Sequence, residues 1–264
     1  MAQVSTIVVT GASGFIGAHI VKACLQKGYN VNACVCVRPH LSFRRAGTVR
    51  ARSLFHSQLL TPWHLPALCD TRRNKDDPKN DFLKEMNNLG GGKIELYSAD
   101  LVTPGAYDDA CASAEAVIHA AAHVDPFDVV DPVKDMIEPS TEGVKNILGS
   151  VNKCPNVKHF VQTSSMAAVG GPGNRPANEG DFNTQGYEGW EEAPALAYNY
   201  AKAAGERTVW EDSEGKPYTV SSINPSMVWG PSLAKAHAKA SPFVFRQALY
   251  GNDQVRLDVL RSLS

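Results

Sequence analysis

The sequence predicts an α/β fold built on a doubly wound parallel sheet, and three observations support this prediction. Short apolar runs rich in β-branched residues recur along the chain, and stretches with helical periodicity separate them. The first run leads into a glycine-rich turn that opens a helix. Small and polar residues follow the later runs, at the edge where the carboxyl ends of parallel strands gather and ligands bind.

The glycine turn follows a buried strand that we expect over residues 6–10. Gly11, Gly14 and Gly17 are spaced three residues apart. Such a turn brings backbone N–H groups and a helix N-terminus up to a pyrophosphate. A side chain at Gly11 or Gly14 would hold the phosphates away, and Gly17 lets the helix lie close to the strand. A turn that binds nothing is the alternative, but the strand–turn–helix context favours a dinucleotide site in a Rossmann-type fold.

The other elements follow from periodicity and from glycine stop signals. A helix is expected over 16–27, ended by Gly28, and a second strand over 31–37. Further on, we expect helices over 77–88, 107–113, 131–153 and 195–210, and strands over 93–98, 116–122 and 157–163.

Composition narrows the function classes. The chain has 264 residues, of which 43% are hydrophobic, and a net charge of −1, so nothing draws it to nucleic acid. Its six cysteines form no C-x-x-C pair. His119 and His123 lack a third ligand at metal spacing, so we expect no metal site. With no leader and no apolar run long enough for a membrane span, we expect a cytoplasmic protein that makes no membrane contact.

Residues 36–69 are anomalous because they contain five arginines and three histidines but no acidic residue. Three interpretations compete: a solvated basic loop, a functional basic patch, or an insertion foreign to the fold. We favour the insertion, because joining Val35 to Asp70 restores a continuous strand end. The end of the second strand decides cofactor preference: an acid there favours NAD, and an arginine favours the 2′-phosphate of NADP. Arg38 follows this strand, and if the segment is an insertion the 2′-phosphate could be met either by Arg38 or by Arg72 and Arg73.

Two further patterns carry chemistry. Ser164 and Ser165 follow the strand expected over 157–163, where a ligand would lie. Tyr198 and Lys202 are four residues apart and share a helix face. A lysine ammonium close to a phenol lowers the pKa of the phenol, which can then exchange a proton with a carbonyl or an alcohol. A serine hydroxyl aimed at the same oxygen would stabilise the charge that develops there.

These motifs together resemble the extended short-chain dehydrogenase/reductase superfamily, the NAD-dependent epimerase/dehydratase family. Within it, the sequence is most similar to the branch of dihydroflavonol reductases, cinnamoyl-CoA reductases and yeast-type carbonyl (aldehyde) reductases. The resemblance covers about residues 4–35 and 70–251. It rests on Thr10–Gly17, Asp100-Leu101, His119–Ala122, Thr163–Ser165, the Tyr198-x-x-x-Lys202 motif and Asn224–Pro231.

The resemblance implies a role for each matching residue. Tyr198 would donate a proton to the substrate carbonyl, Lys202 would hold the nicotinamide ribose and lower the tyrosine pKa, and Ser165, rather than Ser164, would hydrogen-bond the carbonyl oxygen. The remaining positions would contact the cofactor: Gly11, Gly14, Phe15, Ile16 and Gly17 at the pyrophosphate, Asp100 and Leu101 at the adenine, Ala120 and Ala121 beneath the cofactor, and Pro225 and Val228 at the nicotinamide amide.

We therefore predict an NAD(P)-binding domain over 1–230 and an incomplete substrate lobe over 231–264, because family members continue well beyond Pro231. The expected function is NADPH-dependent reduction of a small ketone or aldehyde, with NADP(H) preferred and NAD(H) possible. Two alternatives stay open: a nucleotide-sugar epimerase or dehydratase, and a catalytically weak NAD(P)-binding or regulatory protein such as a shortened isoform. The expected state is a monomer or a homodimer.

Overall fold

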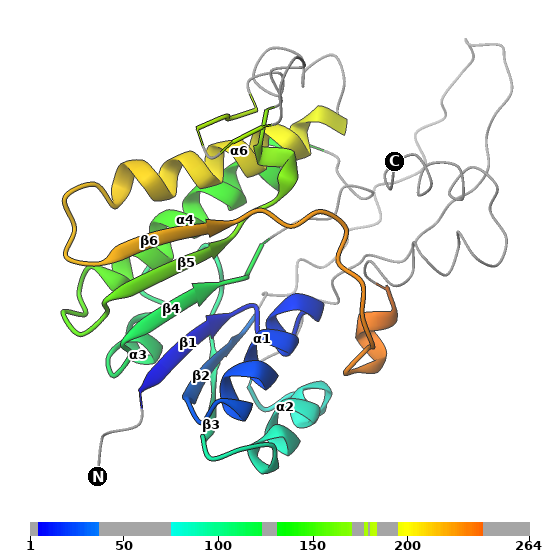
Figure 1. The fold of residues 1–264 in the computed structure, drawn as a ribbon. Coiled ribbons are helices and arrows are strands. Elements are labelled where there is room, and N and C mark those ends of the chain that lie inside the picture. The colour runs from blue at the N-terminus through cyan, green and yellow to red at the C-terminus, as the bar shows by residue number, and fades with distance from the viewer. Residues whose placement is uncertain are drawn as a thin grey trace, which may run out of the picture.

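A computed structural model describes residues 5–36, 75–122, 131–170, 177–178, 180–183 and 195–239. Within these ranges, six strands form one parallel sheet in the order β3-β2-β1-β4-β5-β6 (Figure 1). The order reverses between β1 and β4, as in doubly wound folds, so the predicted fold class is confirmed. The strands are β1 (Thr6–Thr10), β2 (Asn30–Val35), β3 (Ile94–Ser98), β4 (Ala116–His119), β5 (His159–Thr163) and β6 (Thr219–Ile223).

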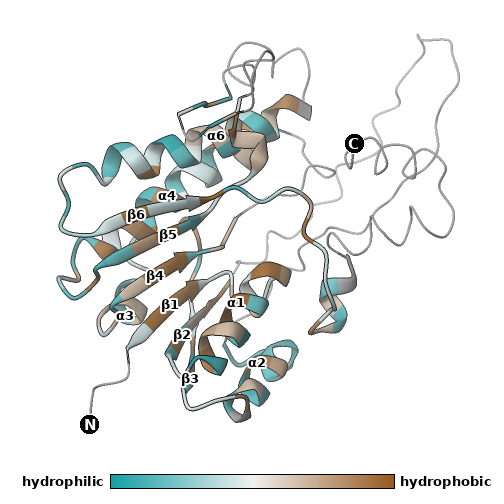
Figure 2. Cartoon of the chain, viewed as in Figure 1, coloured by the Kyte–Doolittle hydropathy of each residue, from teal (hydrophilic) through white to brown (hydrophobic). Residues whose placement is uncertain are grey.

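Helices cover both faces of the sheet and produce two apolar layers. On one face, α1 (Phe15–Gln26) and α2 (Asp81–Glu85) pack over a cluster that includes Val9. On the other face, α3 (Asp108–Cys111), α4 (Glu138–Val151) and α6 (Ala195–Asp212) pack over a cluster that includes Val8. Adjacent strand residues point to opposite faces, so the apolar run of β1 supplies both layers. Figure 2 shows the apolar strands between helices whose outer surfaces are polar.

Two predicted helices are interrupted, and a proline explains the interruption of the longer one. The helix expected over 131–153 begins with a π-helical segment, η3 (Val133–Ile137), before α4. Pro139 has no N–H to donate, so regular α-helical bonding cannot pass through it. The helix expected over 77–88 consists of η1 (Pro78–Asn80), α2 and η2 (Met86–Asn88). Pro78 stands at the start of η1, where Asp77 caps the segment by accepting a 2.9 Å hydrogen bond from Lys79 N.

The remaining boundaries differ by a few residues from the predictions. β2 ends at Val35 and β4 at His119, each earlier than expected, and β6 was absent from the predicted elements. Short segments η4 (Met166–Ala168) and η5 (Lys235–Lys239) follow β5 and β6. No helix among the described residues is both long and apolar enough to cross a membrane. The proposed insertion beyond Cys36 and the chain after residue 239 lie outside the described residues, so the domain division stays a prediction.

Candidate active site

The glycine turn joins β1 to α1 and is built from backbone contacts that a side chain would disrupt. Gly11 adopts a φ of 64°, and a Cβ added to it would lie 2.8 Å from the Cα atom of Ala121. Gly14 is the N-cap of α1, and no side chain caps the helix there. The first N–H groups of α1, including those of Phe15 and Ile16, are therefore available to an anion.

Gly17 sets how closely α1 approaches the turn. A Cβ at this position would lie 2.1 Å from the carbonyl oxygen of Gly11, which is far inside van der Waals contact. We expect Gly17→Ala to lower the free energy of unfolding by about 1–3 kcal/mol, because backbone atoms must shift to admit the methyl group. Since the same shift distorts the turn, NADPH affinity should fall at least about ten-fold. Urea unfolding and cofactor titration measure the two effects.

Gly149 in α4 offers a matched control for this substitution. It is exposed, and a Cβ there would meet nothing within 4 Å. Gly149→Ala should therefore stabilise the protein by about 0.5–1 kcal/mol, as alanine does in a helix interior, and leave NADPH binding unchanged. Equal effects of the two substitutions would contradict the steric role of Gly17.

β4 ends beside the glycine turn through a buried polar link. The hydroxyl of Thr10 accepts a 3.0 Å hydrogen bond from the N–H of Ala121 and lies 2.8 Å from Nδ1 of His119. His119 is 3% exposed, and burial lowers its pKa to about 3, with a smaller contribution from the charge of Lys202. The ring is therefore neutral at pH 7 and serves as a fixed hydrogen-bonding group. This link places Ala120 and Ala121 directly against the turn.

The strand end expected to meet the adenine is held by α4. Asp100 accepts a 2.9 Å hydrogen bond from Val102 N, and Asn146 donates a 3.1 Å hydrogen bond to the carbonyl of Leu101. Leu101 is 9% exposed and fills the space in front of Gly143, where a Cβ would lie 2.6 Å from its Cγ. Close packing between this loop and α4 therefore fixes the position of Asp100 and Leu101.

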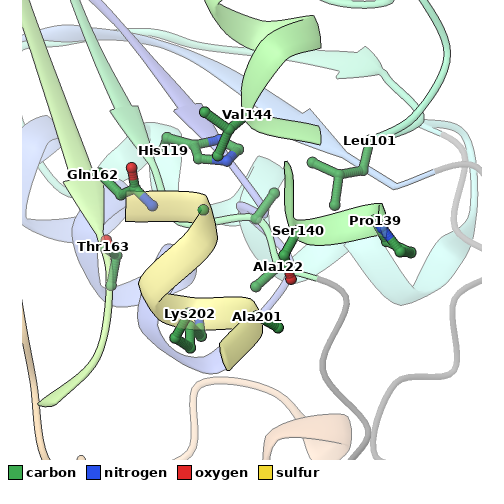
Figure 3. A pocket seen from close by; sticks show the side chains of 12 residues that line it. Leu101, His119, Ala122, Pro139, Ser140, Val144, Gln162, Thr163, Ala201 and Lys202 are labelled. Carbon is green, nitrogen blue, oxygen red and sulfur yellow. The ribbon is translucent and has the colours of Figure 1, made fainter. Parts of the chain in front are cut away.

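A pocket joins three segments that the sequence analysis assigned to the cofactor. It is lined by Leu101 after β3, Ala121 after β4 and Lys202 on α6 (Figure 3). Gln162 of β5 lines it as well, and its Oε1 atom is buried without a hydrogen-bond partner among the described residues. Gln162 therefore makes one side of the pocket polar. The other lining residues of the pocket are His119, Ala122, Pro139, Ser140, Val144, Thr163, Ala201 and Gly205.

The two serines after β5 use their hydroxyls differently. Ser165 begins η4, and its Oγ atom accepts a 3.1 Å hydrogen bond from Ala167 N, so its own proton is left to donate. Ser164 instead donates its proton to Glu206 at 2.5 Å. Ser165 therefore has the donor that an oxyanion needs.

α6 places Tyr198 and Lys202 near this strand end, because η4 packs against the helix. The Lys202 Nζ atom lies 5.9 Å from the centroid of the Tyr198 ring. Desolvation of the half-buried lysine lowers its pKa to about 8, and the negative charge of Glu206 partly opposes this shift. Lys202 is therefore still mainly cationic at pH 7 and stabilises negative charge on neighbouring groups.

After β6 the chain crosses from α6 toward α1 (Figure 1). The carbonyl of Pro225 accepts a 3.0 Å hydrogen bond from Met166 N, and His19 Nε2 lies 2.9 Å from the carbonyl of Pro231. The centroid of the Phe15 ring lies 5.8 Å from that of His237, so the Phe15 side chain packs against this segment. Val228 lies half-buried within the segment.

A model of the NAD dependent epimerase/dehydratase family matches residues 7–262. The chain belongs to this family. Among curated relatives, a cinnamoyl-CoA reductase from Petunia hybrida is 30% identical over 86% of this chain and 55% of its own length. A dihydroflavonol 4-reductase from Gerbera hybrida is 28% identical over 87% of this chain and 53% of its own length. The resemblance to this branch of the family is thereby confirmed.

Solved structures of family members agree with the fold. The NADPH complex of Gre2 from Candida albicans superimposes with a TM-score of 0.67 at 24% identity, over 93% of this chain and 66% of that one. The NADPH complex of the yeast methylglyoxal/isovaleraldehyde reductase Gre2 gives a TM-score of 0.62 at 26% identity, over 86% of this chain and 59% of that one. The chain spans 52–63% of the length of the curated relatives that it matches.

Some predicted site residues lie outside the described part of the chain, and some described residues were not predicted. Arg38, Arg72 and Arg73, which bear on NADP preference, lie outside the described residues. His123 does as well, and the described residues contain no group of three metal-ligating side chains. Thr10, Gln162, Glu206 and Asn224 were given no role from the sequence. Thr10 and Asn224 lie within motifs that carry the family resemblance, and Glu206 stands four residues from Lys202, but Gln162 carried no such signal.

Proposed function

We propose that this chain is an NADPH-dependent oxidoreductase that reduces a ketone or an aldehyde to an alcohol. The observation that carries this proposal is the arrangement around α6. Tyr198 and a cationic Lys202 stand on the helix against which η4 packs, and Ser165, which caps η4, has an available donor at the carboxyl edge of the sheet that also holds the glycine turn. Each supplies a part of the chemistry that carbonyl reduction requires.

The residues present fit a nicotinamide dinucleotide. The glycine turn leaves no room for a Cβ at Gly11 or Gly17, and the N-terminus of α1 is not capped by a side chain. Both features suit a pyrophosphate that approaches the backbone closely. When bound, the nicotinamide supplies the hydride. The yeast Gre2 structure is described as an NADPH complex, which supports NADP(H) as the preferred cofactor, with NAD(H) as the alternative.

In this proposal each residue has one task. Tyr198 donates its phenolic proton to the substrate oxygen as the carbonyl carbon is reduced. Lys202 stabilises the phenolate that remains, since its ammonium lies on the same helix face. Ser165 donates a hydrogen bond to the substrate oxygen and stabilises the charge that develops on it. Ser164 is not the donor, because its proton is held by Glu206.

A cofactor titration followed by a turnover assay tests the proposal. We expect NADPH to bind more tightly than NADH, as judged by quenching of protein fluorescence. NADPH oxidation should then follow addition of at least one class from a panel of aldehydes, ketones and flavonoid-type carbonyls. Conversion of a nucleotide sugar without net NADPH oxidation, followed by chromatography of the sugar product, would favour an epimerase or dehydratase, because these reactions return the cofactor to its starting state. Binding without any turnover would favour a weakly catalytic or regulatory protein and would contradict the proposed reduction.

A further inference from the structure

A buried carboxylate lies directly behind the proposed catalytic residues. Glu206 is 8% exposed and stands one helical turn after Lys202 on α6. Its Oε2 atom accepts a 2.5 Å hydrogen bond from Ser164 Oγ and a 2.7 Å hydrogen bond from Asn224 Nδ2. Asn224 Nδ2 also donates to the backbone carbonyl of Ser165 at 3.1 Å. One carboxylate thus connects α6, the end of β5 and the end of β6.

This connection stands where the ladder between two strands finishes. Ser164 N donates to the carbonyl of Ile223 at 2.8 Å, and Met166 N donates to the carbonyl of Pro225 at 3.0 Å. The carbonyl of Ser165, between these two ladder bonds, accepts a 2.9 Å hydrogen bond from Ala168 N as well as the 3.1 Å hydrogen bond from Asn224 Nδ2, whose amide Glu206 also holds. The backbone at Ser165 is therefore held by strand pairing, by the first turn of η4 and by the amide that the carboxylate orients.

A buried charge is a costly way to hold two strand ends together. Removing a carboxylate from water is unfavourable unless hydrogen bonds compensate, and a neutral amide could accept the same two bonds. The charge therefore calls for a second role, and the position of Glu206 offers one. Residues four apart lie on one helix face, so the carboxylate and the Lys202 side chain are neighbours.

We propose that Glu206 is a positioning residue, whose buried carboxylate locks Ser165 onto the helix that carries Tyr198 and Lys202. The inference rests on the proposed function, because Ser165, Tyr198 and Lys202 are catalytic only if the chain is a reductase. Its expected consequence is that loss of the carboxylate slows turnover more than it weakens cofactor binding, since Glu206 lies behind the reacting groups and touches neither ligand.

The charge of Glu206 adds an electrostatic effect on Lys202. Desolvation lowers the pKa of Lys202 to about 8, and Glu206 opposes that shift. The other groups that share the pocket with Lys202 give no comparable support: His119 is neutral at pH 7, and Gln162, Thr163 and Ser140 carry no charge. The Tyr198 ring lies beneath the ammonium. Without the carboxylate, the pKa of Lys202 should therefore fall further, and less of it should be cationic at neutral pH.

Substitution of Glu206 by glutamine separates charge from shape. Glutamine keeps the acceptor oxygen and a similar length, so the fold should survive. We expect kcat for NADPH-dependent reduction at pH 7 to fall about two- to ten-fold, because a smaller fraction of Lys202 is cationic once the opposing charge of Glu206 is gone. Modification of Lys202 by an amine-reactive reagent can be followed by mass spectrometry of the full chain. In Glu206→Gln, the pH at which half of Lys202 is modified should be lower than in the wild type. Exposed Glu211 on the same helix is the control, and Glu211→Gln should change neither quantity.

Two more variants distinguish the positioning role of Glu206 from its electrostatic effect on Lys202. Glu206→Asp keeps the charge but is shorter, so it should retain the wild-type modification pH of Lys202 while kcat falls. Ser164→Ala removes one hydrogen bond and leaves the carboxylate in place, so kcat should also fall with little change in the modification pH. If either variant matched the wild type in kcat, the positioning role would be wrong. If Glu206→Gln left the modification pH unchanged, the electrostatic role would be wrong.

The labelling experiment also separates this inference from the proposed function. Lys202 modification requires no substrate and no turnover. If the wild type bound NADPH but reduced no carbonyl, the proposed function would fail, and positioning for catalysis would fail with it. A lower modification pH in Glu206→Gln would still establish that Glu206 acts on Lys202.

Discussion

Replacing Tyr198 by phenylalanine is expected to lower kcat for carbonyl reduction by about 10²- to 10⁴-fold, the range that a general acid contributes. The substitution removes one oxygen atom and keeps the ring that packs beside Met136 and Ala201. The fold should therefore be unaffected. NADPH affinity should change little, because Lys202 and the glycine turn are untouched. Stopped-flow measurement of NADPH oxidation at saturating cofactor, together with a fluorescence titration, distinguishes loss of chemistry from loss of binding.

Tyr200 supplies the matched control, because it stands two residues further along the same helix and is also half-buried. Tyr200→Phe removes the same atom from a position that the motif does not assign to catalysis. We expect its kcat to stay within about two-fold of the wild type, as an ordinary non-catalytic substitution allows. If Tyr198→Phe retained wild-type turnover, Tyr198 would not be the proton donor, and Ser165 would become the group to examine.

The part of the site that local sequence controls was predictable. The glycine turn is determined by three spaced glycines between an apolar strand and a helix, and the structure gives the contacts that require them. The parallel sheet follows from the alternation of strands and helices, because parallel strands need crossover connections, whereas the strand order was not predicted. The family resemblance then assigned Tyr198 and Lys202 to α6, and their four-residue spacing placed them on one face.

The residues that sequence reasoning missed act through contacts between distant segments. Glu206 and Ser164 are 42 residues apart, and Thr10 and His119 are 109 apart. A hydroxyl, an imidazole or a carboxylate in a single sequence gives no indication of which distant group it will face. Pro139 was visible in the sequence, but periodicity predicted an uninterrupted helix over 131–153 and did not reveal the π-helical segment before α4. Composition and periodicity indicate which residues are buried, but they do not indicate which distant residues contact each other.

His119 provides the second large effect, a dependence of stability on pH. Its pKa is lowered to about 3 by burial, whereas an unfolded histidine titrates near 6.5. Between these values the unfolded state binds a proton that the native state does not, so stability falls as the pH falls through this window. At pH 7 the contribution of neutral His119 to the free energy of unfolding is fully present. At pH 4 the free energy of unfolding should be lower by about 3 kcal/mol, and this decrease should be complete only below pH 3.

Comparison of His119→Asn with the wild type isolates the effect of His119 protonation on the free energy of unfolding. Asparagine can still pair with the Thr10 hydroxyl, which lies 2.8 Å from the imidazole Nδ1 atom, but it does not titrate. Urea unfolding at pH 7 and pH 4 should show that the wild type loses about 3 kcal/mol more than the variant. Carboxylates titrate in both proteins and cancel in the difference.

His159 offers the control for this substitution. It is exposed and also contacts a threonine hydroxyl, at 2.7 Å, so His159→Asn should keep the wild-type dependence of stability on pH. Equal losses in the wild type and His119→Asn would mean that the imidazole is protonated in the native state at pH 4.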